Sequence, residues 1–201
     1  MLCVGSLLPP DHLRLDLPVD AGALVADLGR LPDDAWVPHF NTGQYSGDWS
    51  GVPLVMVGGR PDRLFPEPGS DAPPTATPRL AECPGSAAFL AGLECPVLSA
   101  RLLRLGPGAE VTEHRDNRLG YVDGEVRLHV PVTTGPGASF RLAGREVAMA
   151  PGECWYVDVN EPHAVANHGT AARVHLVVDA RLDEWLDRVF QRSLVTALDR
   201  A

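Results

Sequence analysis

The sequence predicts a mainly β protein of the jelly-roll type, with a helix near each end of the chain. From residue 96 onward, short runs rich in Val and Leu are separated by turns rich in Gly and Pro. Strands that recur at this spacing are typical of an antiparallel sandwich or barrel. On either side of this region, apolar residues recur at the spacing of one helix face. The eight predicted strands span 97–105, 109–113, 126–133, 138–142, 145–149, 154–159, 163–167 and 172–179.

The two flanking helices are predicted at 19–31 and 181–201. In the first, leucines recur at helical spacing, and Asp20 is placed to cap the N-terminus. Before it, charged and apolar residues alternate over 14–17, which predicts an edge strand. The C-terminal helix is predicted from the spacing of Leu182, Trp185, Leu186, Val189 and Phe190.

The segment between the first helix and the β region is harder to interpret. Residues 36–57 alternate apolar and small polar residues, which predicts two short strands joined at Gly47–Asp48. Residues 58–86 are dense in Pro, Gly, Ser and Thr, and we interpret them as a long surface loop, of the kind that often covers an active site. We therefore expect a single domain over 1–201. It would have N-terminal strands, helix and loop over 1–95, a β core over 96–180 and the C-terminal helix.

Composition excludes several functions. A chain of 201 residues suits one domain, and its net charge of −9 and pI of about 5.1 give no basic surface for nucleic acid or an anionic membrane. All seventeen cationic residues are Arg and none is Lys. This excludes a Schiff-base lysine, an anchor for pyridoxal phosphate and a P-loop lysine.

The cysteines and the N-terminus indicate a cytoplasmic protein. No CxxC pair or regular spacing occurs, so neither a disulfide framework nor a structural zinc site is expected. The first residues lack the basic and apolar regions of a signal peptide, and no apolar run is long enough to cross a bilayer. The sequence does not indicate an oligomeric state. The four cysteines are Cys3, Cys83, Cys95 and Cys154.

A candidate metal-binding motif lies in the C-terminal half. His114 and Asp116 form an HxD pair, and His163 follows 47 residues after the aspartate. On a strand, residues i and i+2 point to the same face, so this pair can present a nitrogen and an oxygen to one point. Two histidines and one carboxylate are the ligand set of non-haem iron(II) oxygenases. The simpler interpretation of an isolated HxD is a surface histidine beside a solvated aspartate.

Arginines within apolar strands support the site interpretation. Arg173 stands ten residues after His163 in the run 171–178, where burying an unpaired cation is costly. Its planar fork suits a dicarboxylate ligand, whereas the alternative is an outward-facing residue on a half-exposed strand. Arg127 and His129 repeat the pattern, with both side chains on the face opposite the apolar positions. We expect that face to be polar and to point inward.

At these residues the chain resembles the aspartyl/asparaginyl β-hydroxylase-type oxygenases, which include bacterial proline 3-hydroxylase-like enzymes. The resemblance covers about 36–180. Its specific motifs are His114-Arg115-Asp116-Asn117, then Arg127-Leu128-His129-Val130-Pro131-Val132, and the run from Pro151 through His163 and Arg173 to Asp179. An earlier stretch, Tyr45-Ser46-Gly47-Asp48-Trp49, is similar to the N-terminal part of the family.

The resemblance implies a double-stranded β-helix, which is cupin-like, with Fe(2+) bound by the two histidines and the aspartate described above. It further implies that 2-oxoglutarate chelates the iron, with its distal carboxylate on Arg173 and support from His129. Arg127 could bind either the cosubstrate or the substrate. The implied reaction uses O2, hydroxylates a side-chain carbon and releases succinate and CO2. Asp116 is present, unlike in the branch that acts on epidermal-growth-factor-like domains, so the chain resembles the bacterial type.

The substrate and the reaction class leave alternatives. An amino-acid-like small molecule or a peptide-borne residue is the expected substrate, and Arg118, Asn41 and Trp49 are the candidates to bind it. Trp49 could equally be a core residue, and Arg118 a solvated surface residue. The competing functions are a cupin-type metal enzyme that does not use 2-oxoglutarate and a jelly-roll binding module with an inactive site.

Overall fold

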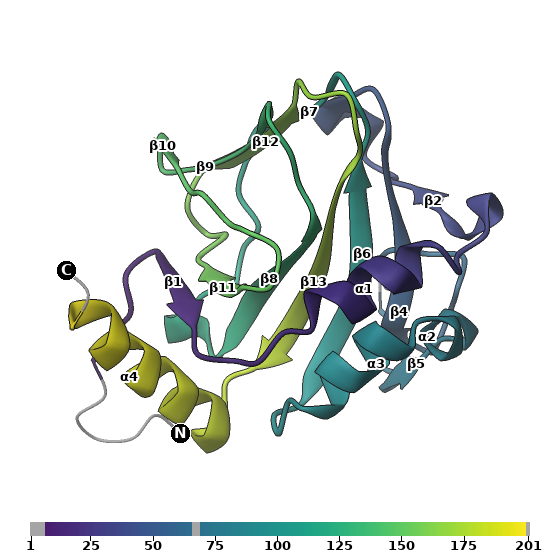
Figure 1. The fold of residues 1–201 in the computed structure, drawn as a ribbon. Helices are drawn as coiled ribbons and strands as arrows, with labels where there is room; N and C mark the ends of the chain where they lie inside the picture. Colours follow the sequence, from purple (N-terminus) through teal and green to yellow (C-terminus); the bar gives the residue numbers. More distant parts are fainter. Residues whose placement is uncertain (1–6, 66–68, 200–201) are drawn as a thin grey trace.

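The computed structural model describes residues 7–65 and 69–199, so Cys3 and residues 66–68 of the predicted loop lie outside it. Its larger sheet has eight strands (Figure 1). In spatial order they are β1 (His12–Leu15), β11 (Cys154–Val157), β8 (Glu125–Thr133), β13 (Arg173–Arg181), β6 (Val97–Leu105), β4 (Trp49–Val57) and β2 (Val37–Pro38), with β5 (Pro74–Ala76) on β4.

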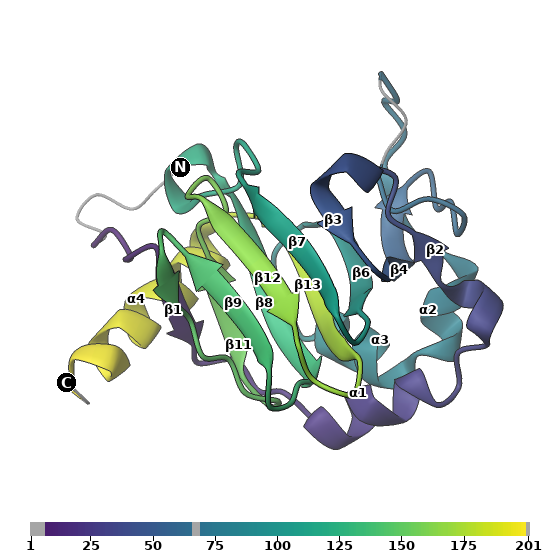
Figure 2. The same cartoon turned by 90° about the horizontal axis from the view of Figure 1, so that it is seen from above.

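A smaller, five-stranded sheet faces the larger one. Figure 2 looks onto it, with β9, β12 and β7 running side by side in front of β8 and β13. Its order is β10 (Arg145–Glu146), β9 (Ala138–Leu142), β12 (His163–Asn167), β7 (Ala109–His114) and β3 (Tyr45–Ser46). The predicted jelly-roll architecture with flanking helices is confirmed. The strand predicted at 145–149 is wrong in length, because only its first two residues pair with β9.

Alternation along the strands divides the larger sheet into two chemically different faces. On β8, Val126, Leu128 and Val130 belong to the main apolar core. Arg127 and His129, between them in sequence, line the space between the two sheets instead. Because successive side chains of a strand point to opposite faces, one sequence supplies both the core and the inner wall. This alternation places the polar residues of the barrel where a ligand can reach them.

Helices cover the outer face of the larger sheet. α1 (Ala21–Leu28), α3 (Pro84–Ala91) and α4 (Glu184–Leu198) contribute apolar side chains to the same core (Figure 1). Asp20 caps α1 as predicted, its side chain accepting from the Ala23 backbone N–H at 2.9 Å. In the described part of the chain, no helix has both the length and the apolar character needed to span a membrane.

The prediction of one long loop over 58–86 is wrong. The described part of this stretch contains β5, α2 (Pro78–Glu82) and the start of α3. Pro78 and Pro84 each stand in the first turn of a helix. Proline is well suited there because its fixed φ matches the helix and its missing N–H would have no intrahelical partner. The same prolines that indicated a loop in the sequence therefore begin two helices.

The two strands predicted around Gly47 form, but they join different sheets. β3 pairs with β7, and β4 pairs with β6. Gly47 adopts a φ of 78°, and a Cβ added there would lie 2.8 Å from the Ala109 Cα, so this turn requires glycine. The chain thus crosses from the small sheet to the large one at the edge of the barrel, which brings Trp49 to the cavity between them.

Candidate metal centre

The two histidines of the motif lie opposite each other on neighbouring strands. His114 is the last residue of β7 and His163 the first of β12, and their Cα atoms are partners in the ladder. Their ring centroids are 4.2 Å apart. This adjacency follows from the register of β7 and β12 and places both imidazoles at the same end of the small sheet.

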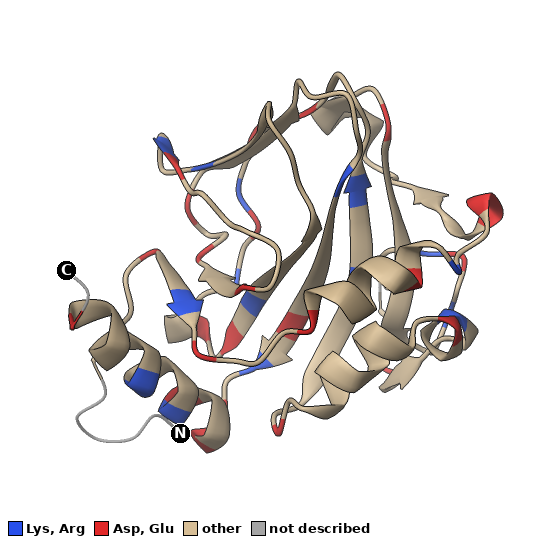
Figure 3. Ribbon diagram, in the orientation of Figure 1, with Lys and Arg blue, Asp and Glu red and all other residues tan. Residues whose placement is uncertain are grey.

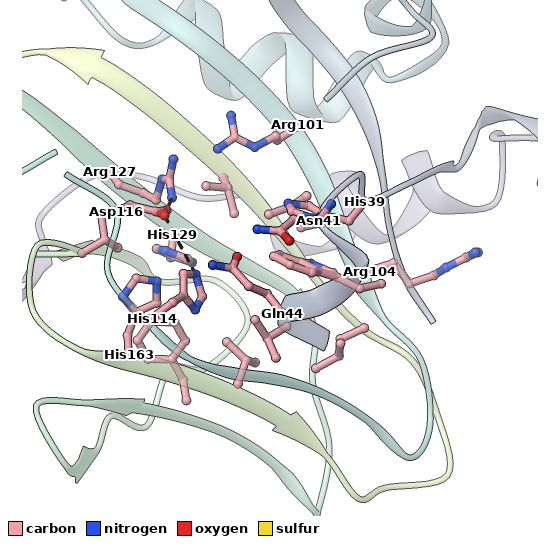
Figure 4. A pocket seen from close by; sticks show the side chains of 18 of the residues that line it. His39, Asn41, Gln44, Arg101, Arg104, His114, Asp116, Arg127, His129 and His163 are labelled. Carbon is pink, nitrogen blue, oxygen red and sulfur yellow. Dashed lines mark hydrogen bonds and ion pairs between the residues drawn. The ribbon is translucent and has the colours of Figure 1, made fainter. Parts of the chain in front are cut away.

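Asp116 reaches the site by a different route from the one predicted. It lies beyond the end of β7, so the expectation that it shares a strand face with His114 is wrong. Its backbone N–H donates to the Val159 carbonyl at 2.8 Å, which fixes the loop that carries it. The carboxylate Oδ1 lies 3.9 Å from His114 Nε2. The structure nevertheless gathers the three residues, because one ligand atom from each lies within 4.8 Å of the others (Figure 4).

Backbone carbonyls orient both imidazoles for metal binding. His114 Nδ1 lies 2.8 Å from the Thr112 carbonyl oxygen, and His163 Nδ1 lies 3.0 Å from that of Glu161. A carbonyl oxygen only accepts, so each Nδ1 carries the proton and each Nε2 keeps a free lone pair. Burial lowers the pKa of His163 to about 4, which keeps the ring neutral at physiological pH. Neutral imidazole is the form that binds a metal.

Arg127 holds the aspartate of the triad. Its Nη1 donates to the Asp116 carboxylate, while Nε and Nη2 donate to the two oxygens of Asp179 at 2.7 and 3.0 Å. Figure 3 shows the corresponding basic and acidic segments side by side on β8 and β13. Burial alone would lower the pKa of Arg127, but the carboxylates of Asp179 and Asp116 raise it above its ordinary value. Arg127 therefore holds the candidate ligand Asp116, and its three nitrogens are already engaged.

The triad opens into a cavity of about 250 Å³ between the two sheets. Arg118, which was expected to bind substrate, is exposed and does not line this cavity. The other predicted site residues do, as do several aromatic and polar side chains. The cavity lining includes His39, Asn41, Trp49, Phe65, Arg101, Arg104, Arg127, His129, Phe140 and Arg173.

Arg173 and His129 have polar groups in this cavity that lack an ion-pair or hydrogen-bond partner among the described residues. The Arg173 side chain points inward and is 7% exposed, which excludes the outward-facing alternative. Its Nη2 lies 3.2 Å from His175 Nδ1 and its guanidinium lies over the Phe140 ring, but no carboxylate among the described residues pairs with it. Burial lowers its pKa only to about 10, so the group stays charged. Both ring nitrogens of His129 are buried without a hydrogen-bond partner in the described structure.

These orphaned groups fit an anionic ligand. A buried cation and a buried donor are costly unless a partner satisfies them. Phe140 neighbours both groups, because its ring centroid is 6.1 Å from that of His163 and 6.0 Å from the Arg173 guanidinium. The residues present therefore suit a metal ion at one end and a carboxylate at the other.

Sequence reasoning missed Arg101, Phe65 and Asp179. Arg101 interrupts the apolar strand predicted at 97–105, just as Arg173 interrupts the strand predicted at 172–179. The same pattern could therefore have identified Arg101 as a candidate site residue. Asp179 lay within the resembling region but had no assigned role. Phe65 stands in the segment interpreted as a loop, where no periodicity of apolar residues marks it.

Solved structures that match this chain include an oxygenase, a monooxygenase and a cupin domain. An oxidoreductase of the 2OG-Fe(II) oxygenase family from Burkholderia pseudomallei has a TM-score of 0.53 and 16% identity, covering 90% of this chain and 87% of its own. A non-heme monooxygenase, ThoJ, in a nickel complex gives 0.49 and 14%, with coverages of 86% and 74%. A cupin domain from Bordetella pertussis gives 0.34 and 20%, with coverages of 44% and 86%. The first of these shows that the fold is shared.

The sequence also matches a family profile over most of its length. The profile is that of aspartyl/asparaginyl beta-hydroxylase, and the match covers residues 22–182. It includes the three clustered candidate ligands and both arginines of the inner wall that the sequence had indicated. The chain therefore belongs to the aspartyl/asparaginyl β-hydroxylase family.

Proposed function

We propose that this protein is an iron(II)- and 2-oxoglutarate-dependent hydroxylase of an amino-acid-like side chain, free or peptide-borne, that releases succinate and CO2. One observation carries the proposal. Three candidate metal-ligand atoms and a buried guanidinium, which no carboxylate of the described residues pairs with, share a single cavity. A metal alone would need only the first of these, whereas a metal-chelating dicarboxylate needs both.

Each residue has a definite task in this proposal. His114, Asp116 and His163 hold the iron through three positions and leave the others open to ligands. Arg173 pairs with the distal carboxylate of 2-oxoglutarate, and His129 hydrogen-bonds the cosubstrate between the two ends. When bound, the iron and 2-oxoglutarate supply the activation of O2, with one oxygen atom going to succinate and one to a C–H bond of the substrate.

The proposal assigns Arg127 a role different from the one expected. Its bonds to Asp116 and Asp179 make it a support of the metal ligand rather than a binding group for cosubstrate or substrate. Asn41 and Trp49 line the same cavity and are the proposed contacts to the substrate, with Trp49 stacked on His39 at 3.6 Å between centroids. Arg118 has no part in the proposal because its side chain is exposed and outside the cavity.

The test combines spectroscopy with product analysis. Anaerobic addition of iron(II) and 2-oxoglutarate to the metal-free protein should produce the weak visible charge-transfer band of a chelate. With O2 and a screen of amino acids and peptides, succinate release should match the gain of one oxygen atom in a substrate by mass spectrometry. A protein that binds iron but gives no band with 2-oxoglutarate would contradict the proposal.

The same measurements separate the two competing functions. A cupin-type metal enzyme that does not use 2-oxoglutarate would turn over a substrate without releasing succinate. A binding module with an inactive site would show neither the band nor any oxygen consumption. The buried Arg173, which no carboxylate of the described residues pairs with, favours the 2-oxoglutarate-dependent enzyme, because the distal carboxylate of that cosubstrate gives this costly cation a partner.

A further inference from the structure

Arg101 is a second buried cation of the cavity, and the proposed function gives it no task. It lies on β6, is 3% exposed and lines the cavity. Its Nη1 donates to Ser99 Oγ at 2.7 Å and to Asp179 Oδ2 at 3.2 Å. The Nε is buried without a partner, and in the described part of the chain Nη2 also donates to no acceptor. Two of the three nitrogens of this guanidinium therefore have no hydrogen-bond partner among the described residues.

Asp179 cannot neutralise Arg101 alone because it also serves Arg127. Arg127 contacts both of its oxygens, and Arg101 adds a third contact to one of them. Within the barrel, three guanidinium groups (Arg101, Arg127 and Arg173) face two carboxylates (Asp116 and Asp179), which leaves one positive charge. Iron(II) and the 2-oxoglutarate dianion add charges that cancel. One positive charge therefore remains for the substrate to balance.

The fourth arginine of the cavity does not change this balance. Arg104 Nε lies 3.2 Å from Asp48 Oδ2, and its guanidinium stacks over Trp36 at 4.3 Å. This side chain already has a carboxylate and an aromatic partner. It therefore offers a matched control, a cation of the same wall that needs no ligand.

An aromatic wall adjoins Arg101. Its guanidinium lies 5.3 Å from the centroid of the Phe65 ring, which is 5.0 Å from that of His39. Burial, followed by the charge of Arg101, lowers the pKa of His39 to about 4, so this ring is neutral. Figure 4 shows Arg101 and His39 across the cavity from His114 and His163. A group bound at Arg101 would thus place its carbon skeleton between the aromatic wall and the metal.

The cavity offers no matching site for an ammonium group. Asp116 is its only carboxylate among the described lining residues, and that residue is the metal ligand. A zwitterionic amino acid would bring a positive charge into a chamber that already has one in excess, and burying an unpaired charge is costly. An acid whose amine is absent or acylated avoids this cost.

We propose, building on the function proposed above, that Arg101 anchors a carboxylate of the substrate and that the preferred substrates are acids lacking a free ammonium group. The class includes simple carboxylic acids, N-acylated amino acids and peptide-borne residues that keep a carboxylate (a C-terminal residue or an acidic side chain), as opposed to free amino acids. Arg101 is then the residue that selects the substrate by charge, as Arg173 selects the cosubstrate.

The test uses matched pairs of compounds on the anaerobic protein loaded with iron(II) and 2-oxoglutarate. Each carboxylic acid of a panel is compared with its primary amide, and each free amino acid with its N-acetyl derivative. Binding is measured as the perturbation of the visible band and as the shift in thermal unfolding temperature. We expect acids and N-acetyl compounds to bind at least about tenfold more tightly than their partners.

Variants then assign the selectivity to Arg101. Arg101→Gln should weaken binding of the best acid at least about tenfold, while Arg104→Gln should leave it unchanged. Arg101→Lys keeps the charge without the fork, so it should retain the preference for acids at lower affinity. The comparison in the wild-type protein stands even if Arg101→Gln fails to fold.

Several outcomes would overturn the inference. The inference is wrong if no acid in the panel binds more tightly than its amide. It is also wrong if free amino acids bind more tightly than their N-acetyl derivatives. Equal affinity of Arg101→Gln and wild type would place the anchor elsewhere. Failure of the function proposed above gives a different result from failure of this inference. It would remove the visible band with 2-oxoglutarate, but the thermal shifts of the metal-free protein would still compare the binding of acids with that of amides.

Discussion

Replacing Arg173 with methionine should separate the stability of the barrel from its affinity for 2-oxoglutarate. In the protein without ligand, Arg173 is a buried cation that no carboxylate of the described chain pairs with. Burial lowers its pKa from 12.5 to about 10, which corresponds to a destabilisation of about 3 kcal/mol at pH 7, where the group is charged in both folded and unfolded chains. Methionine fills similar space without the charge, so Arg173→Met should unfold at a higher temperature than wild type.

The same substitution should weaken cosubstrate binding. Losing one partner of a buried, hydrogen-bonded ion pair costs about 2–5 kcal/mol, so the Kd for 2-oxoglutarate should rise at least about 30-fold. Anaerobic titration of the visible band measures this Kd, and chemical denaturation of the metal-free protein measures stability. Arg118→Met, which changes an exposed arginine outside the cavity, should alter neither. An unchanged Kd in Arg173→Met would refute the reasoning and place the dicarboxylate elsewhere.

Two further predictions concern the metal and the helices. Ala substitutions of His114, Asp116 or His163 should each abolish turnover and iron-dependent absorbance. The far-ultraviolet circular dichroism should stay that of a β protein. Activity like that of wild type in either histidine variant would contradict the assignment. Asp27 is fully buried and accepts hydrogen bonds from the backbone N–H groups of Gly85 and Ser86. Asp27→Ala should therefore lower the free energy of unfolding by about 2–4 kcal/mol, without changing activity per folded molecule.

The strands of the barrel could be predicted because their pattern is local. Alternation along 126–133 and 172–179 follows directly from a two-residue period, and this period alone separates the inward-facing arginines from the valines of the core. The segment 58–86 could not be predicted in this way. Pro and Gly mark turns and the first residues of helices alike, and its two helices are too short to show a clear period.

The cluster of His114, Asp116 and His163 was predictable from a short motif, but the residues that contact it were not. Arg127 and Asp179 are 52 residues apart in the chain and meet only because they are Cα partners of β8 and β13. On the other side of β13, Asp179 faces Ser99 of β6, which brings Arg101 within reach of the same carboxylate. Strand register depends on long-range packing, which one sequence does not reveal. For this reason the sequence suggested that Arg127 binds the cosubstrate or the substrate, whereas in the structure it donates to Asp116 and Asp179.

Arginine at position 173 keeps its charge over a range of pH in which a lysine at the same buried position would lose it. The burial that lowers the pKa of Arg173 to about 10 leaves that group charged at pH 7–9. Acting on a lysine, whose ordinary pKa is about 10.4, the same burial would bring the value to about 8. Arg173→Lys should therefore bind 2-oxoglutarate more weakly as the pH rises from 7 to 9, because above the pKa each binding event must first protonate the amine. Its Kd relative to wild type, measured anaerobically at each pH, should rise several-fold over this range. A constant ratio would mean that the site at position 173 is more hydrated than the structure shows.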